Sequence, residues 1–362
     1  MRLRRSLLLA ICIILFIYFE IHSCSKDRIA GPGPQPTEAS IICAATSLHF
    51  LDAHVGCVTG NLGTVMVTKD GGATWSGAEA GDGTLTAAQL IDGVSGWLVG
   101  KDGVIYRTED GGSTWAASGP TGYPAGEDFY KVHFMGTLVG YVLGYHGVYK
   151  TVDGGASWRN NWLPDVPTRD AWDMSFIDEQ TGYLLGSRYT DPDPTILYKT
   201  TDGGASWSPV DGAKIGVLGA TVTIDFVSER VGWAGGGAVL KTVDGGATWQ
   251  KQVPTATVRQ FFFFDEDRGF AVGGKTILKT LDGGAAWENV TPPDPRIDDL
   301  RGVFFTDADN GWVVGRAPDE TKNGKLYKHT ILLRTTDGGA SWRLKDFPFD
   351  YTSANDASVT VD

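Results

Sequence analysis

Bulky and cationic side chains recur at one position of a repeated sequence unit. Each lies four residues before a recurring hydrophobic residue: Tyr130, Trp172, Arg259 and Arg301. Aromatic rings offer flat apolar faces for stacking, and guanidinium groups fix the orientation of a charged or hydroxylated ligand. Nearby segments add further charged and aromatic residues: Arg169, Asp170, Arg188, Tyr189 and Arg296. These residues predict a surface that binds a protein or a glycan. The alternative is that Tyr130 and Trp172 plug the central channel and that the charged residues are solvated at its rim.

Seven copies of an eight-residue motif define the repeat in which these side chains recur. The copies are variants of one sequence, for example TKDGGATW, TVDGGASW and TLDGGAAW, and their aspartates are Asp70, Asp110, Asp153, Asp202, Asp244, Asp282 and Asp337. Successive aspartates lie 40, 43, 49, 42, 38 and 55 residues apart. A period near 40 residues with one hairpin turn per unit is typical of a four-stranded propeller blade. The sequence therefore predicts an all-β, seven-bladed propeller of four antiparallel strands per blade over residues 40–350. The tail, 351–362, is a candidate for closing the ring.

The motif itself has a structural interpretation. Its Asp carboxylate is suited to accept backbone N–H groups of the turn, and its two glycines can adopt positive φ. A Ser or Thr supplies a further hydroxyl in every copy except the sixth, which has Ala286. We expect these turns, which we call Asp boxes, on one face of the ring. The candidate binding residues should then lie on loops at the opposite face, where function usually concentrates.

The Asp boxes resemble the bacterial neuraminidase repeats of sialidases, tandem-propeller xyloglucanases and sortilin-type receptors. The longer unit, GWLVG followed by GVIYRTEDGGSTW, resembles the photosystem II stability and assembly factors and their relatives in non-photosynthetic bacteria. This resemblance covers about residues 46–345. It implies a propeller that binds a membrane-protein partner during assembly, and the acidic composition favours a non-photosynthetic relative.

A glycan hydrolase of sialidase type is the alternative function. Such an enzyme needs three arginines around the substrate carboxylate, for which Arg259, Arg296 and Arg301 are the candidates. The sequence has no HExxH, GxSxG or P-loop motif and no Cys/His cluster with metal-ligand spacing. We therefore favour a non-catalytic binding or assembly scaffold with no metal and no cofactor.

The formal net charge is -12. Loss of a leader with three Arg and one Glu would leave about -14, a charge that repels phosphate backbones. The sequence also lacks a basic cluster with interleaved aromatic residues. We therefore expect no nucleic acid among its partners.

The N-terminus predicts export. Three Arg and a 13-residue apolar run, 7–19, precede Cys24, as in a signal peptide. Ile21, Ser23 and Cys24 resemble the lipobox of bacterial lipoproteins, although His22 departs from the usual small residue. This resemblance implies a signal peptide over 1–23, lipidation of Cys24 and a tether over 24–39, hence an outer-membrane or cell-surface lipoprotein that binds an envelope partner. A periplasm-facing orientation and an uncleaved membrane anchor remain alternatives.

Two cysteines remain, Cys43 and Cys57. They are a candidate disulfide in an oxidising compartment. However, Cys57 occupies the position that holds an aromatic residue after Gly96, Gly140 and Gly182 in later repeats. Its simpler role is therefore a buried thiol that fills the core.

Overall fold

The computed structural model describes residues 45–81, 83–119, 126–161, 171–187, 195–211, 215, 223–253, 255–322, 325–327, 329–345 and 359–360. All of them lie in the unit formed by residues 40–362. The residues before this unit and Cys43 lie outside the described ranges, so the lipidation of Cys24 remains a prediction.

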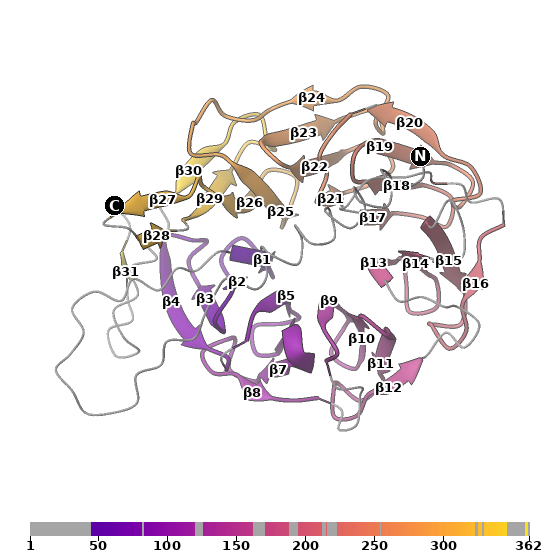
Figure 1. The fold of residues 1–362 in the computed structure, drawn as a ribbon, viewed down its shortest axis with the longest axis horizontal. Helices are drawn as coiled ribbons and strands as arrows, with labels where there is room; N and C mark the ends of the chain where they lie inside the picture. The colour runs from indigo at the N-terminus through magenta and orange to yellow at the C-terminus, as the bar shows by residue number, and fades with distance from the viewer. Residues whose placement is uncertain are drawn as a thin grey trace, which may run out of the picture. The chain divides into compact units, whose positions relative to one another are not determined.

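Seven antiparallel sheets of four sequential strands form a ring, which confirms the predicted fold (Figure 1). We call the strands of each blade a to d, from the axis outward. Blade 1 contains β1 (Ala45–Phe50), β2 (Gly56–Gly60), β3 (Thr64–Thr68) and β4 (Thr74–Glu79). Blade 2 contains β5 (Leu85–Leu90), β6 (Gly96–Gly100), β7 (Ile105–Thr108) and β8 (Ala116–Ala117), with the 3₁₀ turn η1 (Lys101–Gly103). Blade 3 contains β9 (Phe129–Met135), β10 (Val139–Gly144), β11 (Gly147–Thr151) and β12 (Arg159–Asn161).

The remaining blades repeat this order. Blade 4 contains β13 (Ala171–Phe176), β14 (Gly182–Ser187), β15 (Thr195–Thr200) and β16 (Ser208–Pro209). Blade 5 contains β17 (Thr223–Phe226), β18 (Gly232–Gly235), β19 (Val239–Thr242) and β20 (Gln250–Val253). Blade 6 contains β21 (Gln260–Phe263), β22 (Gly269–Gly273), β23 (Thr276–Thr280) and β24 (Glu288–Asn289). Blade 7 contains β25 (Asp299–Phe305), β26 (Gly311–Arg316), β29 (Thr330–Thr335) and β30 (Arg343–Lys345).

Two further elements accompany these blades. The hairpin β27 (Glu320–Lys322) and β28 (Lys325–Tyr327) lies between strands b and c of blade 7. The C-terminal strand β31 (Val359–Thr360) pairs with β4 as a fifth strand at the outer edge of blade 1. Each inner strand packs against the inner strands of both adjacent blades, including β25 against β1.

Aromatic stacking joins the blades. At six of the seven seams, the aromatic residue that follows the strand-b glycine stacks on the strand-a phenylalanine of the next blade, at 3.5 to 4.4 Å between ring centroids. Tyr183 on Phe226, at 3.7 Å, is one example. The glycine is required because a Cβ at Gly182 would lie 2.5 Å from the ring of Phe176 in its own blade.

The seam between blades 1 and 2 is different. Cys57 and Leu90 pack together there, both almost fully buried, in place of the ring pair. Cys57 is a free thiol, and burial raises its pKa to about 12. The thiol therefore stays protonated and apolar in the core, as a filling residue should.

The Asp boxes connect strands c and d of each blade. In blade 3, Asp153 accepts hydrogen bonds from the N–H and hydroxyl of Ser157 and from the hydroxyl of Thr151. Both glycines of every box have positive φ. In the sixth box, Asp282 receives the N–H of Ala286 but lacks that hydroxyl bond. The first box glycine also donates its N–H to a carbonyl of the strand a to b turn in all seven blades.

Candidate functional site

The inner strands carry a repeated bulge at the end opposite the Asp boxes. The pairing of strands a and b skips one residue on strand a in five blades: Thr46, Thr86, Tyr130, Trp172 and Arg301. These are the residues that the sequence placed four before the recurring hydrophobic residue. A bulge interrupts the ladder and re-aims the side chain, and bulges are common at barrel rims and binding sites.

In blades 1 and 2 the bulged side chain connects neighbouring blades. The Thr46 hydroxyl donates to the carbonyl of Leu85, and the Thr86 hydroxyl donates to the carbonyl of Phe129, each over 2.6 Å. These short hydroxyls are thus engaged in holding inner strands together. The sector of the ring that presents larger side chains begins at blade 3.

Tyr130 and Trp172 occupy the same position in blades 3 and 4, and both are half-buried. The Trp172 indole packs against the apolar cluster between blades 4 and 5, which accounts for its partial burial. Next to them, Lys131 is bonded to Asp173, which also accepts the hydroxyl of Thr223 over 2.8 Å. This network links three consecutive inner strands.

Arg259 and Arg301 meet on one carboxylate. Nε of Arg259 lies 2.7 Å from Oδ1 of Asp299, and Nε of Arg301 lies 3.1 Å from Oδ2. The Asp299 side chain is only 11% exposed, so both of its oxygens are held by guanidinium groups. Burial lowers the pKa of Arg301, while Asp299 opposes that shift. One carboxylate balances only one of the two arginines, so one positive charge remains in excess.

Two further cations adjoin this pair. Lys275 Nζ lies 3.2 Å from Oδ1 of Asp298, and Arg316 Nη2 lies 3.8 Å from Oδ2 of the same residue. The charge of Arg316 also acts on Arg301. We call Arg259, Lys275, Arg301 and Arg316, with Asp298 and Asp299, the basic cluster. Its four cations exceed its two carboxylates by two charges, in a chain whose net charge is -12.

Lys275 and Arg316 were not among the residues predicted from the sequence. Arg316 ends β26, directly after the strand b sequence GWVVG, and Lys275 lies between β22 and β23. Both positions belong to strand b to c connections. A sequence signal was available, because these connections reach the same face as the inner-strand bulges.

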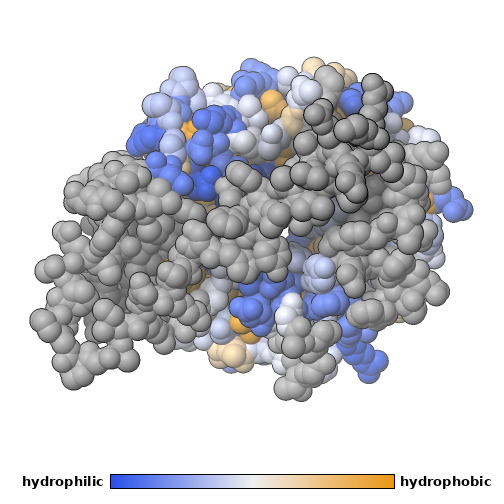
Figure 2. Space-filling model, viewed as in Figure 1, coloured by the Kyte–Doolittle hydropathy of each residue, from blue (hydrophilic) through white to orange (hydrophobic). Residues whose placement is uncertain are grey.

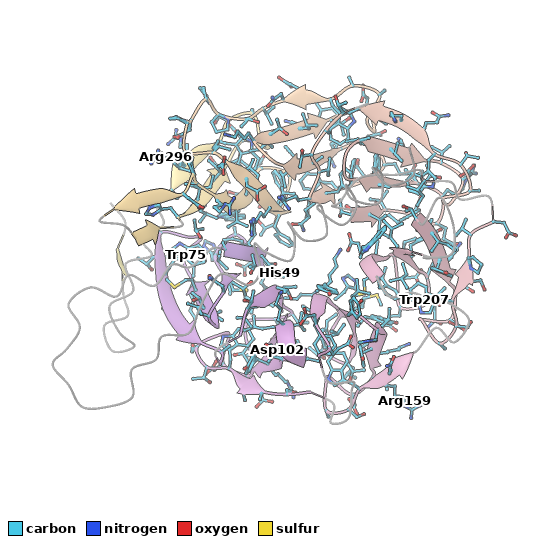
Figure 3. All side chains as sticks on the ribbon, in the orientation of Figure 1. His49, Trp75, Asp102, Arg159, Trp207 and Arg296 are labelled. Atoms are coloured by element: carbon cyan, nitrogen blue, oxygen red, sulfur yellow. The ribbon has the colours of Figure 1, made fainter. Side chains whose placement is uncertain are left out.

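Arg296 does not join the basic cluster. Its guanidinium is bonded to Asp294 of its own loop, over 2.9 Å from Nη2, and it is exposed. Figure 3 shows Arg296 towards the outside of the ring, whereas His49 lies near the centre. Arg259, Arg296 and Arg301 therefore do not converge in the way that a sialidase-like site needs. Four other predicted residues lie outside the described ranges: Arg169, Asp170, Arg188 and Tyr189.

Within the described ranges, no group of three His, Cys, Asp or Glu residues is arranged to hold a metal ion. Among the same residues, no helix has the length and apolar character needed to span a bilayer.

Comparison with known proteins identifies relatives. The model of the family described as photosynthesis system II assembly factor YCF48 matches residues 36–121 and 121–257. The solved structure of YCF48 bound to D1 peptide is 18% identical, with a TM-score of 0.61, over 82% of this chain and 94% of that chain. YCF48 from Cyanidioschyzon merolae is also 18% identical, with a TM-score of 0.58, over 88% of this chain and 98% of that chain.

The propeller fold is shared more widely. A GH74 xyloglucanase from Xanthomonas campestris is 17% identical, with a TM-score of 0.53, over 83% of this chain and 60% of the enzyme. Among curated proteins no sequence matches. At such low identities the solved structures establish a common fold, while the family model matches more than half of the chain.

Proposed function

The chain belongs to the photosynthesis system II assembly factor YCF48 family, and from this premise we propose that it is a non-catalytic scaffold that binds a protein partner. The partner contacts the face of the ring opposite the Asp boxes. A carboxylate of the partner, on a side chain or at a chain end, lies against the basic cluster.

The excess of two positive charges in the basic cluster carries this proposal. Arg301 is largely withdrawn from water, which strengthens its interaction with an incoming carboxylate. Because Asp299 holds both guanidinium groups through Nε, their outer nitrogens are oriented before binding, and less side-chain entropy is lost. Tyr130 and Trp172, at the same end of the inner strands in blades 3 and 4, offer apolar area on the same face of the ring.

Binding by matched variants tests the proposal. The variant Arg259→Gln/Asp299→Asn/Arg301→Gln removes two cations and one carboxylate without leaving a buried charge unpaired. Its control, Arg230→Gln/Asp265→Asn/Arg268→Gln, removes the same charges from the face that carries the Asp boxes. Proteins recovered from detergent-solubilised membranes are quantified by mass spectrometry. We expect wild type and control to recover the same partner, and the first variant to lose it by about tenfold or more. Equal recovery by all three folded proteins would contradict the proposal.

We also propose that the scaffold is held at the envelope by a lipid on Cys24. A short apolar run followed by a lipobox-like cysteine supports this anchor, and the charged and Pro/Gly-rich segment 24–39 supports a tether. Metabolic labelling with an alkyne fatty acid should mark the wild type and not Cys24→Ser. The variant should also accumulate unprocessed and leave the outer-membrane fraction. Equal labelling of Cys24→Ser would refute the anchor without affecting the proposed binding face.

A further inference from the structure

The turns between strands a and b and between strands c and d lie together at one face, which we call the box face. In each blade, the first box glycine donates one hydrogen bond to the adjacent strand a to b turn. These seven hydrogen bonds hold the two sets of turns side by side. The basic cluster lies at the other end of the strands. The two faces therefore present separate surfaces.

The box face carries most of the excess negative charge. Its turns contain eighteen Asp and Glu residues, against three Lys and Arg residues, Lys69, Arg230 and Arg268. Six cations of strand c also extend their side chains into these turns: Arg107, Lys150, Lys199, Lys241, Lys279 and Arg334. The remaining excess of nine negative charges is most of the net charge of -12 for the whole chain. Hydrogen bonds from the hydroxyl and N–H of Ser157 lower the pKa of Asp153 to about 2, and Asp110 is held in the same way by Thr114. The charge consequently persists at any physiological pH.

Exposed aliphatic side chains are concentrated on the same face. Of the six large hydrophobic residues that are exposed in the described ranges, five lie in these turns: Val94 (53%), Leu138 (60%), Val152 (62%), Val243 (51%) and Leu281 (64%). The sixth, Leu62, lies in a strand b to c connection. Single exposed aliphatics are ordinary, but a concentration of them on one face indicates an interaction surface. The view in Figure 2 shows described residues that are mainly hydrophilic, with only small separate hydrophobic areas.

We propose that the box face is a second docking surface, for a protein that presents lysine or arginine side chains around an apolar patch. The aliphatic tips enter the apolar patch and provide affinity. The surrounding carboxylates meet the basic residues, steer the encounter and exclude acidic partners and anionic lipid. This proposal does not depend on the basic cluster, so one protein can bridge two partners through opposite faces.

Blade 3 provides the strongest contact point. Leu138 directly precedes strand b and Val152 directly precedes the Asp-box aspartate, and the two turns are joined by the hydrogen bond from Gly154 N–H to Leu138 O, over 2.9 Å. Blade 4 has Gln180 and Thr201 at the equivalent positions. The variant Leu138→Gln/Val152→Thr therefore gives blade 3 a surface that this chain already uses in a folded blade.

Fluorescence anisotropy with three labelled synthetic peptides tests this surface. The first contains lysine and leucine, the second has serine in place of leucine, and the third has glutamate in place of lysine. Each is titrated with the wild type, with Leu138→Gln/Val152→Thr, and with Arg259→Gln/Asp299→Asn/Arg301→Gln as the control from the other face. The melting temperature of each variant verifies that it is folded.

We expect only the lysine and leucine peptide to bind. Its Kd should rise about tenfold between about 50 and 300 mM salt, and about tenfold in Leu138→Gln/Val152→Thr, with no change in the control variant. Binding of the serine peptide with equal affinity would reduce the effect to general charge attraction and overturn the proposal. No binding of the first peptide, or binding that the Leu138→Gln/Val152→Thr change leaves unaltered, would also overturn it. Loss of binding only in the control variant would assign the peptide to the basic cluster instead.

Discussion

His49 connects two inner strands through a neutral imidazole. Its Nδ1 accepts the N–H of Leu90, over 3.2 Å, and its ring lies 4.6 Å from that of Phe304. Burial, with a smaller effect from the charge of His133, lowers the pKa of His49 to about 3. The unfolded chain protonates this residue near pH 6.5. Below pH 6.5 the unfolded state therefore takes up a proton that the folded state refuses, and stability falls until about pH 3.

His49→Gln should remove this loss. Gln89 occupies the equivalent position in blade 2, where it accepts the N–H of Phe134, so glutamine can replace the acceptor. When the pH falls from 7 to about 5, the unfolding free energy should decrease by about 2 kcal/mol less in the variant than in the wild type. Urea unfolding at several pH values measures this difference.

A second buried group acts in the opposite direction. Burial raises the pKa of Asp225 to about 6, so its contribution to stability is complete below pH 4 and is lost as pH rises through 6. Asp225 is present in both proteins, and its contribution cancels in the comparison. Parallel stability curves for wild type and His49→Gln between pH 7 and 5 would contradict the role given to His49.

At the scale of the strand, the glycine before each stacked ring is a steric requirement. A Cβ at Gly182 would lie 2.5 Å from the Phe176 ring, which is itself stacked on Tyr141 of blade 3. Gly182→Ala should therefore displace the ring at this seam and destabilise the protein by about 2 kcal/mol in denaturant unfolding. Gly93→Ala is the control, because a Cβ at this glycine meets no atom within 4 Å. A similar loss for both variants would show that backbone flexibility, and not the seam, determines the effect.

The sequence could predict the blades because their signals are local. Each Asp box needs Asp, two glycines and a hydroxyl within a few residues, and the Gly-aromatic step needs two adjacent residues. The basic cluster is different, since Arg259, Lys275, Arg301 and Arg316 come from two blades and meet only through Asp298 and Asp299. Arg296 was grouped with them by proximity along the chain, but Asp294 holds it within its own loop. The position of a residue in its repeat predicts the face of the ring on which it lies. The side chains that it contacts depend on residues of the neighbouring blade, which its position does not reveal.

For the whole molecule, the separation of charge between the two faces predicts a dependence on salt. The eighteen carboxylates of the box face outnumber its nine cations, and added salt screens the resulting net repulsion within about 8 Å at physiological ionic strength. The melting temperature should therefore rise when NaCl increases from about 20 to 300 mM. Glu179→Lys, on the box face, should weaken this dependence more than Glu288→Lys, on the outer strand of blade 6. Equal salt slopes for the two variants would contradict this distribution of repulsion.

Every blade takes its four main strands from one stretch of chain, and among the described strands only β31 crosses from the C-terminal part of the chain to blade 1. No sheet has to be split when a repeat is gained or lost, so tandem duplication can change the ring by whole units. The same independence favours circular permutation, because new termini placed between the d strand of one blade and the a strand of the next would leave every main sheet intact. Lineages that inherit this scaffold are therefore free to vary one blade's loops, or to replace a blade, while the neighbouring sheets keep their pairing.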